Sequence, residues 1–223
     1  MKLAALFSGG KDSTYAACLM AQQGHEIVDL VTIIPSDPDS WMFHTPNLHL
    51  LPRLAGAMGI PLLTTECSGG EEAELDALRS ALEGLDIDGV VVGAIASDYQ
   101  WDRVNGVCND LGLRVFAPLW RKEQSMLMAD MIASGLRAVI VRVSAEGLDP
   151  SWLGRELDNS ALNGLRHLSS QKGINVSGEG GEYETLVLDS PLNSSALKIV
   201  SAERKVTRDG GTLLVSDLVA GGS

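Results

Sequence analysis

Over its first 143 residues the chain alternates short apolar runs with helix-like stretches, and most of these stretches end at a glycine. A glycine in that position takes up the left-handed conformation that closes a helix. The pattern therefore predicts a repeated strand–helix unit. Strands are expected near residues 2–7, 27–34, 61–65, 89–94, 114–117 and 138–143. Helices are expected near residues 13–23, 47–58, 71–83, 101–111 and 122–134.

Two of the expected strands are apolar along a continuous run, at residues 90–92 and 139–141. Such runs are typical of strands that are covered on both faces, as in a parallel sheet with helices on each side. The prediction for residues 1–148 is therefore a doubly wound α/β domain. Its ligands are expected at the carboxyl ends of the strands.

The rhythm changes after residue 148. One helix is expected near residues 159–172, and strand-like runs follow a glycine-rich turn at 178–181. The three runs cover residues 185–188, 197–206 and 212–219. We interpret residues 149–220 as a smaller α+β portion that packs on the first domain and lies on the substrate side.

The composition suits a protein that folds around its own core. Of its 223 residues, 45% are hydrophobic. No run approaches the ~18 to 20 apolar residues of a membrane span, and the start of the chain does not resemble a signal peptide, so we expect a cytoplasmic protein without a membrane partner. Cys18, Cys67 and Cys108 are odd in number and far apart, which argues against disulfides, a zinc site and persulfide chemistry.

The chain is strongly acidic, with a formal net charge of −12. Enzymes that act on tRNA need a basic surface for its phosphates, and the longest basic cluster here, at residues 204–208, is short. We therefore expect no nucleic-acid partner, although acidity weakens the tRNA hypothesis without removing it. A protein substrate, or a small cationic one, fits the charge better.

Residues 8–13 read Ser-Gly-Gly-Lys-Asp-Ser, between an apolar run and a helix-like stretch. A glycine-rich turn that enters a helix N-terminus is suited to phosphate, and Lys11 adds a positive charge that we expect to face solvent. The string is not a Walker A loop, because Ala5 stands where that loop has its first glycine and Asp12 where it has a hydroxyl. A plain glycine turn is the alternative.

Residues 178–185, Gly-Glu-Gly-Gly-Glu-Tyr-Glu-Thr, place three carboxylates around a flexible turn. If the segment is extended, Glu182 and Glu184 share one face and Tyr183 lies on the other. Paired carboxylates can hold Mg²⁺, orient an ammonium group or act as a base. The alternative is a solvated acidic hairpin.

Two further clusters follow expected strands. Residues 93–103 lead from a strand into a helix, where Arg103 is suited to a phosphate and Ser97 or Asp98 to a helix cap. Residues 41–47 form a long apolar loop in which Asn47 is expected to cap the next helix. His44 in that loop is equally compatible with substrate contact and with a structural role.

Four strings together resemble the diphthine-ammonia ligase family of PP-loop ATP pyrophosphatases. They are Ser-Gly-Gly-Lys-Asp-Ser at 8–13, Met-Phe-His-Thr-Pro-Asn at 42–47, Gly-Ala-Ile-Ala-Ser-Asp-Tyr-Gln at 93–100 with Arg103-Val104, and the 178–185 string followed by Leu188-Asp189 and Pro191. The likeness covers nearly the whole chain, and the last string is its most specific part. Asn105 departs from the family, which is expected to have Glu there, and this puts any acid–base role at that position in doubt.

The resemblance implies that the carboxylate of diphthine on translation elongation factor 2 is adenylated with ATP and Mg²⁺ and then amidated by ammonia. We assign the ATP phosphates to Ser8, Gly9, Gly10, Lys11, Asp12 and Ser13, the adenine to backbone around Ile33 and Ala94, and Mg²⁺ to Asp12. The expected catalytic residues are Lys11, Asp12, Glu182 and Glu184. The acceptor and ammonia side is assigned to His44, Asn47, Ser97, Asp98, Tyr99, Gln100, Arg103, Glu179, Gly180, Gly181, Glu182, Tyr183 and Glu184.

Two alternatives remain open at this point. One is a PP-loop enzyme that adenylates another acceptor, either a tRNA base or a small carboxylic acid. The other is a non-catalytic nucleotide-binding module, which would have no use for the acidic turn at 178–185. The sequence leaves the oligomeric state open, a homo-oligomer included.

Overall fold

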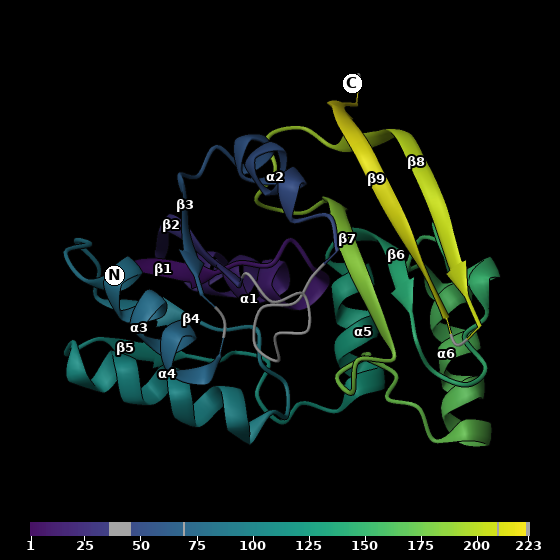
Figure 1. The fold of residues 1–223 in the computed structure, drawn as a ribbon, viewed down its shortest axis with the longest axis horizontal. Helices are drawn as coiled ribbons and strands as arrows, with labels where there is room; N and C mark the ends of the chain where they lie inside the picture. Colours follow the sequence, from purple (N-terminus) through teal and green to yellow (C-terminus); the bar gives the residue numbers. More distant parts are fainter. Residues whose placement is uncertain (36–45, 69, 209, 222–223) are drawn as a thin grey trace.

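The computed structural model describes residues 1–35, 46–68, 70–208 and 210–221. It contains two sheets, and Figure 1 shows the first with its helices on the left and the second with α5 and α6 on the right. The strands are β1 (Lys2–Leu6), β2 (Glu26–Pro35), β3 (Leu62–Cys67), β4 (Gly89–Val91), β5 (Arg114–Phe116), β6 (Arg137–Val143), β7 (Tyr183–Asp189), β8 (Leu197–Thr207) and β9 (Gly210–Ala220). The α-helices are α1 (Lys11–Gln22), α2 (Leu51–Met58), α3 (Glu71–Leu82), α4 (Asp98–Asp110), α5 (Gln124–Ala133) and α6 (Asn159–Lys172), with short 3₁₀ turns η1 (Leu48–Leu50) and η2 (Pro150–Trp152).

The first sheet has the order β3-β2-β1-β4-β5, and each neighbouring pair is parallel. Alternate residues of β1 point to opposite faces of this sheet. Ala4 and Leu6 belong to one buried cluster, and Leu3 and Ala5 belong to another. Side chains from α3 and α4 complete the first cluster, and side chains from α1 and α2 complete the second. The predicted α/β fold with helices on both faces is confirmed.

The second sheet is antiparallel, with the order β7-β6-β9-β8. The expectation that residues 138–143 extend the parallel sheet is wrong, because β6 pairs with β7 and β9 instead. The apolar run arises because β6 is covered on both faces within the second sheet, where residues 138–141 are all buried. The second sheet thus begins at residue 137, ahead of the domain boundary at 148, which stays a prediction.

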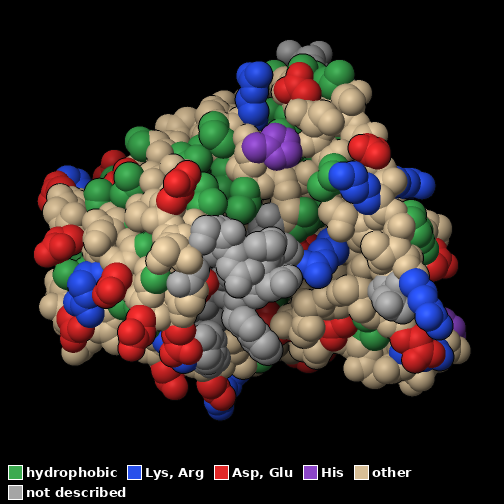
Figure 2. All heavy atoms as spheres, viewed as in Figure 1, with side chains coloured by type: hydrophobic (Ala, Val, Ile, Leu, Met, Phe, Trp, Pro, Cys, Tyr) green, Lys and Arg blue, Asp and Glu red, His purple; other side chains and the backbone are tan. Residues whose placement is uncertain are grey.

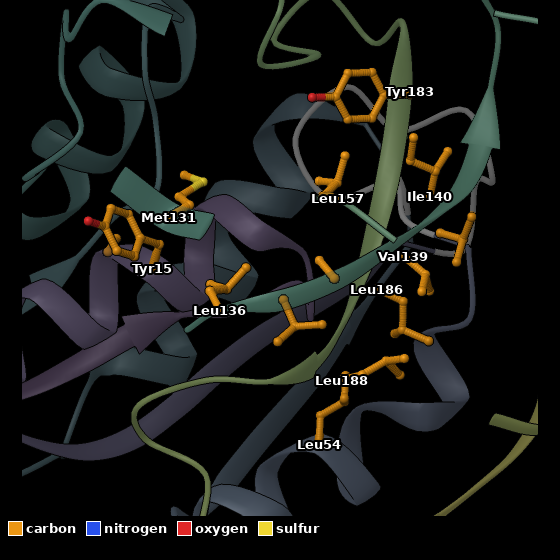
Figure 3. Packing of buried hydrophobic residues seen from close by; sticks show 14 of the residues in the cluster. Tyr15, Leu54, Met131, Leu136, Val139, Ile140, Leu157, Tyr183, Leu186 and Leu188 are labelled. Carbon is orange, nitrogen blue, oxygen red and sulfur yellow. The ribbon is translucent and has the colours of Figure 1, made fainter. Parts of the chain in front are cut away.

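One hydrophobic cluster joins the two sheets. Figure 3 shows Tyr15 of α1 and Met131 of α5 on one side of it, and Val139 of β6 with Leu186 of β7 on the other. A continuous core of this kind holds the two sheets in a fixed relation, because separating them would expose apolar side chains to water. Among the described helices none combines the length and the apolar character that a membrane span requires.

Gly93, just after β4, fixes how closely the first sheet approaches α1. A Cβ atom at this position would lie 2.6 Å from the backbone nitrogen of Ser13 and 2.8 Å from the carbonyl carbon of Asp12. Both are backbone atoms at the start of a helix, so they cannot rotate away as a side chain would. A glycine is therefore required for this packing.

We expect Gly93→Ala to lower the free energy of unfolding by about 2 kcal/mol, because the added methyl group overpacks against backbone. Urea denaturation measures the change. Gly106→Ala in α4 is the matched control, since a Cβ there meets nothing within 4 Å. The control should be neutral or stabilise the protein by about 0.5–1 kcal/mol. Equal stability of the two variants would contradict the packing argument.

Candidate functional site

The loop between β1 and α1 presents an open helix N-terminus. Gly10 occupies the N-cap position of α1 and supplies no side-chain cap. Gly9 has a φ of 75°, and a Cβ there would lie 2.7 Å from a methyl group of Leu54. The two glycines thus bring bare backbone to the first turn of α1, where N–H groups have no partner within the helix. This is the arrangement that binds phosphate.

Lys11 does not face solvent as the sequence suggested. Its residue is 3% exposed, its Nζ lies 2.7 Å from Oδ2 of Asp12, and it stands 5.3 Å from the centre of the Tyr183 ring. Burial among an aromatic ring and a carboxylate holds the ammonium group in one place. Lys11 is therefore a fixed charge at the base of the loop.

Asp12 has a carboxylate with one free oxygen. Oδ2 receives Lys11, whereas Oδ1 is buried and has no hydrogen-bond partner in the described structure. A buried carboxylate oxygen without a partner is unfavourable unless a ligand completes it. Mg²⁺ suits such an oxygen, since it binds through one or two carboxylates together with nucleotide phosphates. The described residues hold no group of three or more His, Cys, Asp or Glu that would form an all-protein metal site.

Strand β7 of the second sheet contacts residues 8–13, the loop between β1 and α1 that we name the phosphate loop. The backbone N–H of Lys11 donates to Oγ1 of Thr185 at 3.0 Å, and the N–H of Val187 donates to the carbonyl of Gly9 at 2.9 Å. β7 is the edge strand of its sheet, so its outward backbone groups are free to make such contacts. Thr185 belongs to the 178–185 motif, but the motif alone indicates no role for it, because only the fold brings together residues 174 positions apart.

Glu179 joins the 178–181 turn to the end of β4. Its Oε1 accepts from the N–H of Ala96 at 2.8 Å and of Ile95 at 3.3 Å. Burial raises the pKa of the Glu179 carboxyl, although these two N–H groups oppose the shift, and the charges of Asp12 and Lys11 also act on it. The structure thus gathers the phosphate loop, the 95–96 segment and the 178–181 turn into one site.

Glu182 organises its own loop. Oε1 accepts from the backbone N–H and the side-chain amide of Asn175, at 2.8 and 2.7 Å, and Oε2 accepts from the N–H of Gly180 at 2.8 Å. Gly181 continues the same turn through a bond from its N–H to the carbonyl of Gly178. Both oxygens of Glu182 are therefore engaged in shaping the turn, and its catalytic role stays a prediction.

Glu184 lies across from Arg142 in the β6–β7 pairing, and the two side chains form an ion pair of 3.0 Å. The Glu184 side chain is 20% exposed, and its Oε2 is buried without a hydrogen-bond partner. Burial raises the pKa of this carboxyl to about 7, against the opposing effect of Arg142. Glu184 is thus able to exchange a proton near neutral pH, as an acid–base residue must.

Tyr183 packs in the core, and its assignment to the acceptor side stays a prediction. It is 3% exposed, its hydroxyl donates to the carbonyl of Val176 at 2.7 Å, and Figure 3 shows the ring among buried side chains. The expected alternation is otherwise present, since Tyr183 and Glu184 point to opposite faces of β7. The ring lies beside the Lys11 ammonium group.

Asn47 differs from its predicted role as helix cap. It stands at the N-cap position of η1 but makes no cap bond. Its buried amide instead donates to the carbonyl of Leu213 at 3.1 Å and accepts from the N–H of Val215 at 2.8 Å. These two bonds tie η1 to β9, and the assignment of Asn47 to the substrate side stays a prediction.

The other predicted residues around β4 have local partners. Asp98 pairs with Arg121 at 3.4 Å on the surface, and Arg103 forms an ion pair with Glu71 of α3. The carbonyl of Ser97 accepts the N–H of Trp101, which places Ser97 at the start of α4. Arg103 therefore links two helices, and its assignment to a phosphate or the acceptor remains a prediction.

Asn105, the departure from the family pattern, donates from its amide to the carbonyl of Trp101 at 2.7 Å. Ile33 on β2 is fully buried and Ala94 after β4 is 5% exposed, so the assignment of their backbone to an adenine ring stays a prediction. His44 lies outside the described residues, as do the side chains of Tyr99 and Gln100. Ser8 and Ser13 share a hydroxyl–hydroxyl contact of 3.2 Å within the phosphate loop.

The two halves of the chain match two family models, described as the diphthamide synthase N-terminal domain over residues 1–115 and the diphthamide synthase C-terminal domain over residues 123–219. The chain belongs to the diphthamide synthase family. Both segments that meet at the phosphate loop, the β1–α1 turn and β7, lie within the matched ranges. The family assignment therefore covers the whole candidate site.

Named relatives agree with this family. The diphthine–ammonia ligase of Mus musculus is 40% identical over 91% of this chain and 84% of its own length. The diphthine–ammonia ligase of Danio rerio is 38% identical over 94% of this chain and 90% of its own length. That of Schizosaccharomyces pombe is 34% identical over 91% of this chain and 37% of its own length. Among solved structures, a predicted subunit of tRNA methyltransferase from Methanocaldococcus jannaschii matches 85% of this chain and 99% of its own, at 15% identity and a TM-score of 0.43.

The Glu184 carboxyl makes stability depend on pH in a defined direction. Because its folded pKa of about 7 lies above the ordinary 4.5, the folded state binds more protons between these values. This contribution is present in full at acidic pH and is lost as pH rises from about 4.5 to 7. We expect wild type to lose about 2 kcal/mol more than Glu184→Gln between pH 5 and pH 8.

Urea denaturation at the two pH values measures this difference. Glu203→Gln on the exposed part of β8 is the control and should follow wild type. The same pH slope in wild type and Glu184→Gln would show that Glu184 titrates normally.

Proposed function

We propose that this protein amidates the diphthine carboxylate of translation elongation factor 2 with ammonia, using ATP and releasing AMP and pyrophosphate. The observation that carries the proposal is the open N-terminus of α1, with the fixed charge of Lys11 and the unpartnered oxygen of Asp12 beside it. The choice of diphthine as acceptor and ammonia as nitrogen donor rests on the relatives, which are named diphthine–ammonia ligases.

The chemistry takes two steps, since a carboxylate is a poor electrophile. First a carboxylate oxygen of diphthine attacks the α-phosphorus of ATP, the bond from that phosphorus to the bridging oxygen breaks, and pyrophosphate leaves. The nitrogen of ammonia then attacks the acyl carbon, the bond to the AMP oxygen breaks, and the new amide nitrogen gives up a proton. The products are diphthamide, AMP and pyrophosphate.

Each part of the site has a task in these steps. The first-turn N–H groups of α1 and the ammonium of Lys11 stabilise the charge that develops on pyrophosphate. Asp12 would hold Mg²⁺, which neutralises phosphate charge when bound. Glu184 has a pKa of about 7, but it lies on the face of β7 opposite Tyr183 and Thr185, so its expected catalytic role stays a prediction.

The charge distribution supports a protein acceptor over a nucleic acid. On the face shown in Figure 2, Lys and Arg side chains are scattered among acidic ones, and the described residues there form no continuous basic surface. An electrostatic footprint for tRNA would be a basic patch or stripe. Because elongation factors work in the cytoplasm, we place the activity there.

An ATP–pyrophosphate exchange assay tests the proposal. Exchange should require elongation factor 2 that carries unamidated diphthine, and neither the amidated factor, tRNA nor small carboxylic acids should replace it. Exchange with another acceptor alone would assign a different substrate. Binding of ATP without exchange under any condition would indicate a nucleotide-binding module.

Lys11→Met should reduce exchange by about a hundredfold or more, since one charge-assisted contact to the transition state is worth roughly 3 kcal/mol. Lys122→Met is the matched control, because Lys122 is an exposed lysine between β5 and α5. Melting temperatures show whether the buried substitution has damaged the fold, and Lys11→Arg provides a second variant that keeps the charge. Near-normal exchange by folded Lys11→Met would remove the phosphate-loop assignment.

Ammonium chloride should serve as the nitrogen source without a glutaminase partner. Burial raises the pKa of the Cys18 thiol, and it raises that of Cys108 to about 11, so neither is a ready nucleophile for glutamine hydrolysis. Amide formation with ammonium chloride and with glutamine, measured by mass spectrometry of the factor, distinguishes the two sources. Amidation with glutamine but not ammonium would contradict this expectation.

A further inference from the structure

Thr185 stands where the two sheets meet the phosphate loop, and its hydroxyl is only half used. Oγ1 accepts the N–H of Lys11, the first residue of α1. The residue is 5% exposed, and the described structure contains no acceptor for its own O–H. A buried hydroxyl proton without an acceptor is unfavourable, so a ligand that accepts it would be bound more tightly.

The position of this O–H is set by its neighbours. Because Oγ1 lies within hydrogen-bond distance of the first N–H of α1, the hydroxyl group stands at the N-terminus of that helix. The N–H groups of Asp12 and Ser13 belong to the same first turn and lack partners within the helix. An anionic oxygen held by that turn is therefore within reach of the Thr185 hydroxyl.

The contact is rigid on both sides. Val187, two residues further along β7, fixes Gly9 through a backbone bond of 2.9 Å, and Tyr183, two residues earlier, lies against Lys11. Three alternate residues of one strand thus face the phosphate loop, as the period of two requires. The hydroxyl is consequently held in place before any ligand arrives.

We propose that Thr185 is a nucleotide-binding residue that donates its hydroxyl hydrogen bond to a phosphate oxygen of ATP, one that leaves with pyrophosphate. The inference rests on the proposed function, because it takes the α1 N-terminus as the phosphate site. It adds that the second sheet supplies part of that site. The nucleotide pocket is therefore incomplete without β7.

Titration calorimetry with pyrophosphate, AMP and a non-hydrolysable ATP analogue tests this role on the full chain with Mg²⁺. Thr185→Val should bind pyrophosphate and the analogue at least tenfold more weakly than wild type and bind AMP equally well. Thr185→Ser keeps the hydroxyl and should restore binding to within about threefold. Thr212→Val, on β9 of the same sheet, is the matched control and should bind all three ligands normally.

The melting temperature of each variant is measured as well. Losing the hydrogen bond from the Lys11 N–H to Thr185 lowers stability whether or not Thr185 contacts a ligand. If Thr185→Val does not fold, Thr185→Ala removes the hydroxyl with less constraint at χ1. Unchanged pyrophosphate affinity in a folded variant would overturn the inference and leave Thr185 as a cap. The inference would also be overturned if Thr185→Val bound AMP as weakly as it binds pyrophosphate and Thr185→Ser did not restore binding.

Wild-type binding distinguishes failure of the proposed function from failure of the Thr185 role. If wild type binds neither pyrophosphate nor the ATP analogue, the proposed function fails, and the role of Thr185 fails with it. If wild type binds both and Thr185→Val binds them equally, only the role of Thr185 fails.

Discussion

The first turn of α1 is clamped between two pieces of backbone. On one side Gly93 lets the end of β4 approach the helix to a distance that excludes any side chain. On the other side β7 binds Gly9 and Lys11 through Val187 and Thr185. The position of the phosphate loop therefore depends on both sheets at once, and the shared hydrophobic cluster keeps those sheets from shifting relative to each other.

The three carboxylates of the 178–185 segment differ in the residues that surround them, and these surroundings set the contacts of each one. Glu179 bridges two loops, Glu182 folds its own turn, and Glu184 pairs with Arg142 while one oxygen stays unpartnered. Three residues of the same type thus have three different sets of contacts. Burial raises the pKa of the Glu184 carboxyl to about 7, because its effect outweighs that of the neighbouring arginine.

The sequence predicted the phosphate loop and the first five strands because these are local features: glycine spacing, apolar runs and helix ends. It could not assign β6 to the right sheet, since an apolar run reports burial and is silent about which partner covers it. The burial of Lys11 and Tyr183, the use of Asn47 by β9 and the Thr185 contact all depend on residues far apart in sequence. Pattern and composition carry no information about such contacts.

The pairing of β7 with the phosphate loop also bears on solubility. A sheet of four strands has two edges, and an open edge invites pairing with another chain and aggregation. One edge is β7, where the N–H of Val187 bonds to the carbonyl of Gly9, so the phosphate loop also covers part of this edge strand. The other edge is β8, where charged residues such as Lys198, Glu203 and Lys205 are exposed and discourage intermolecular pairing.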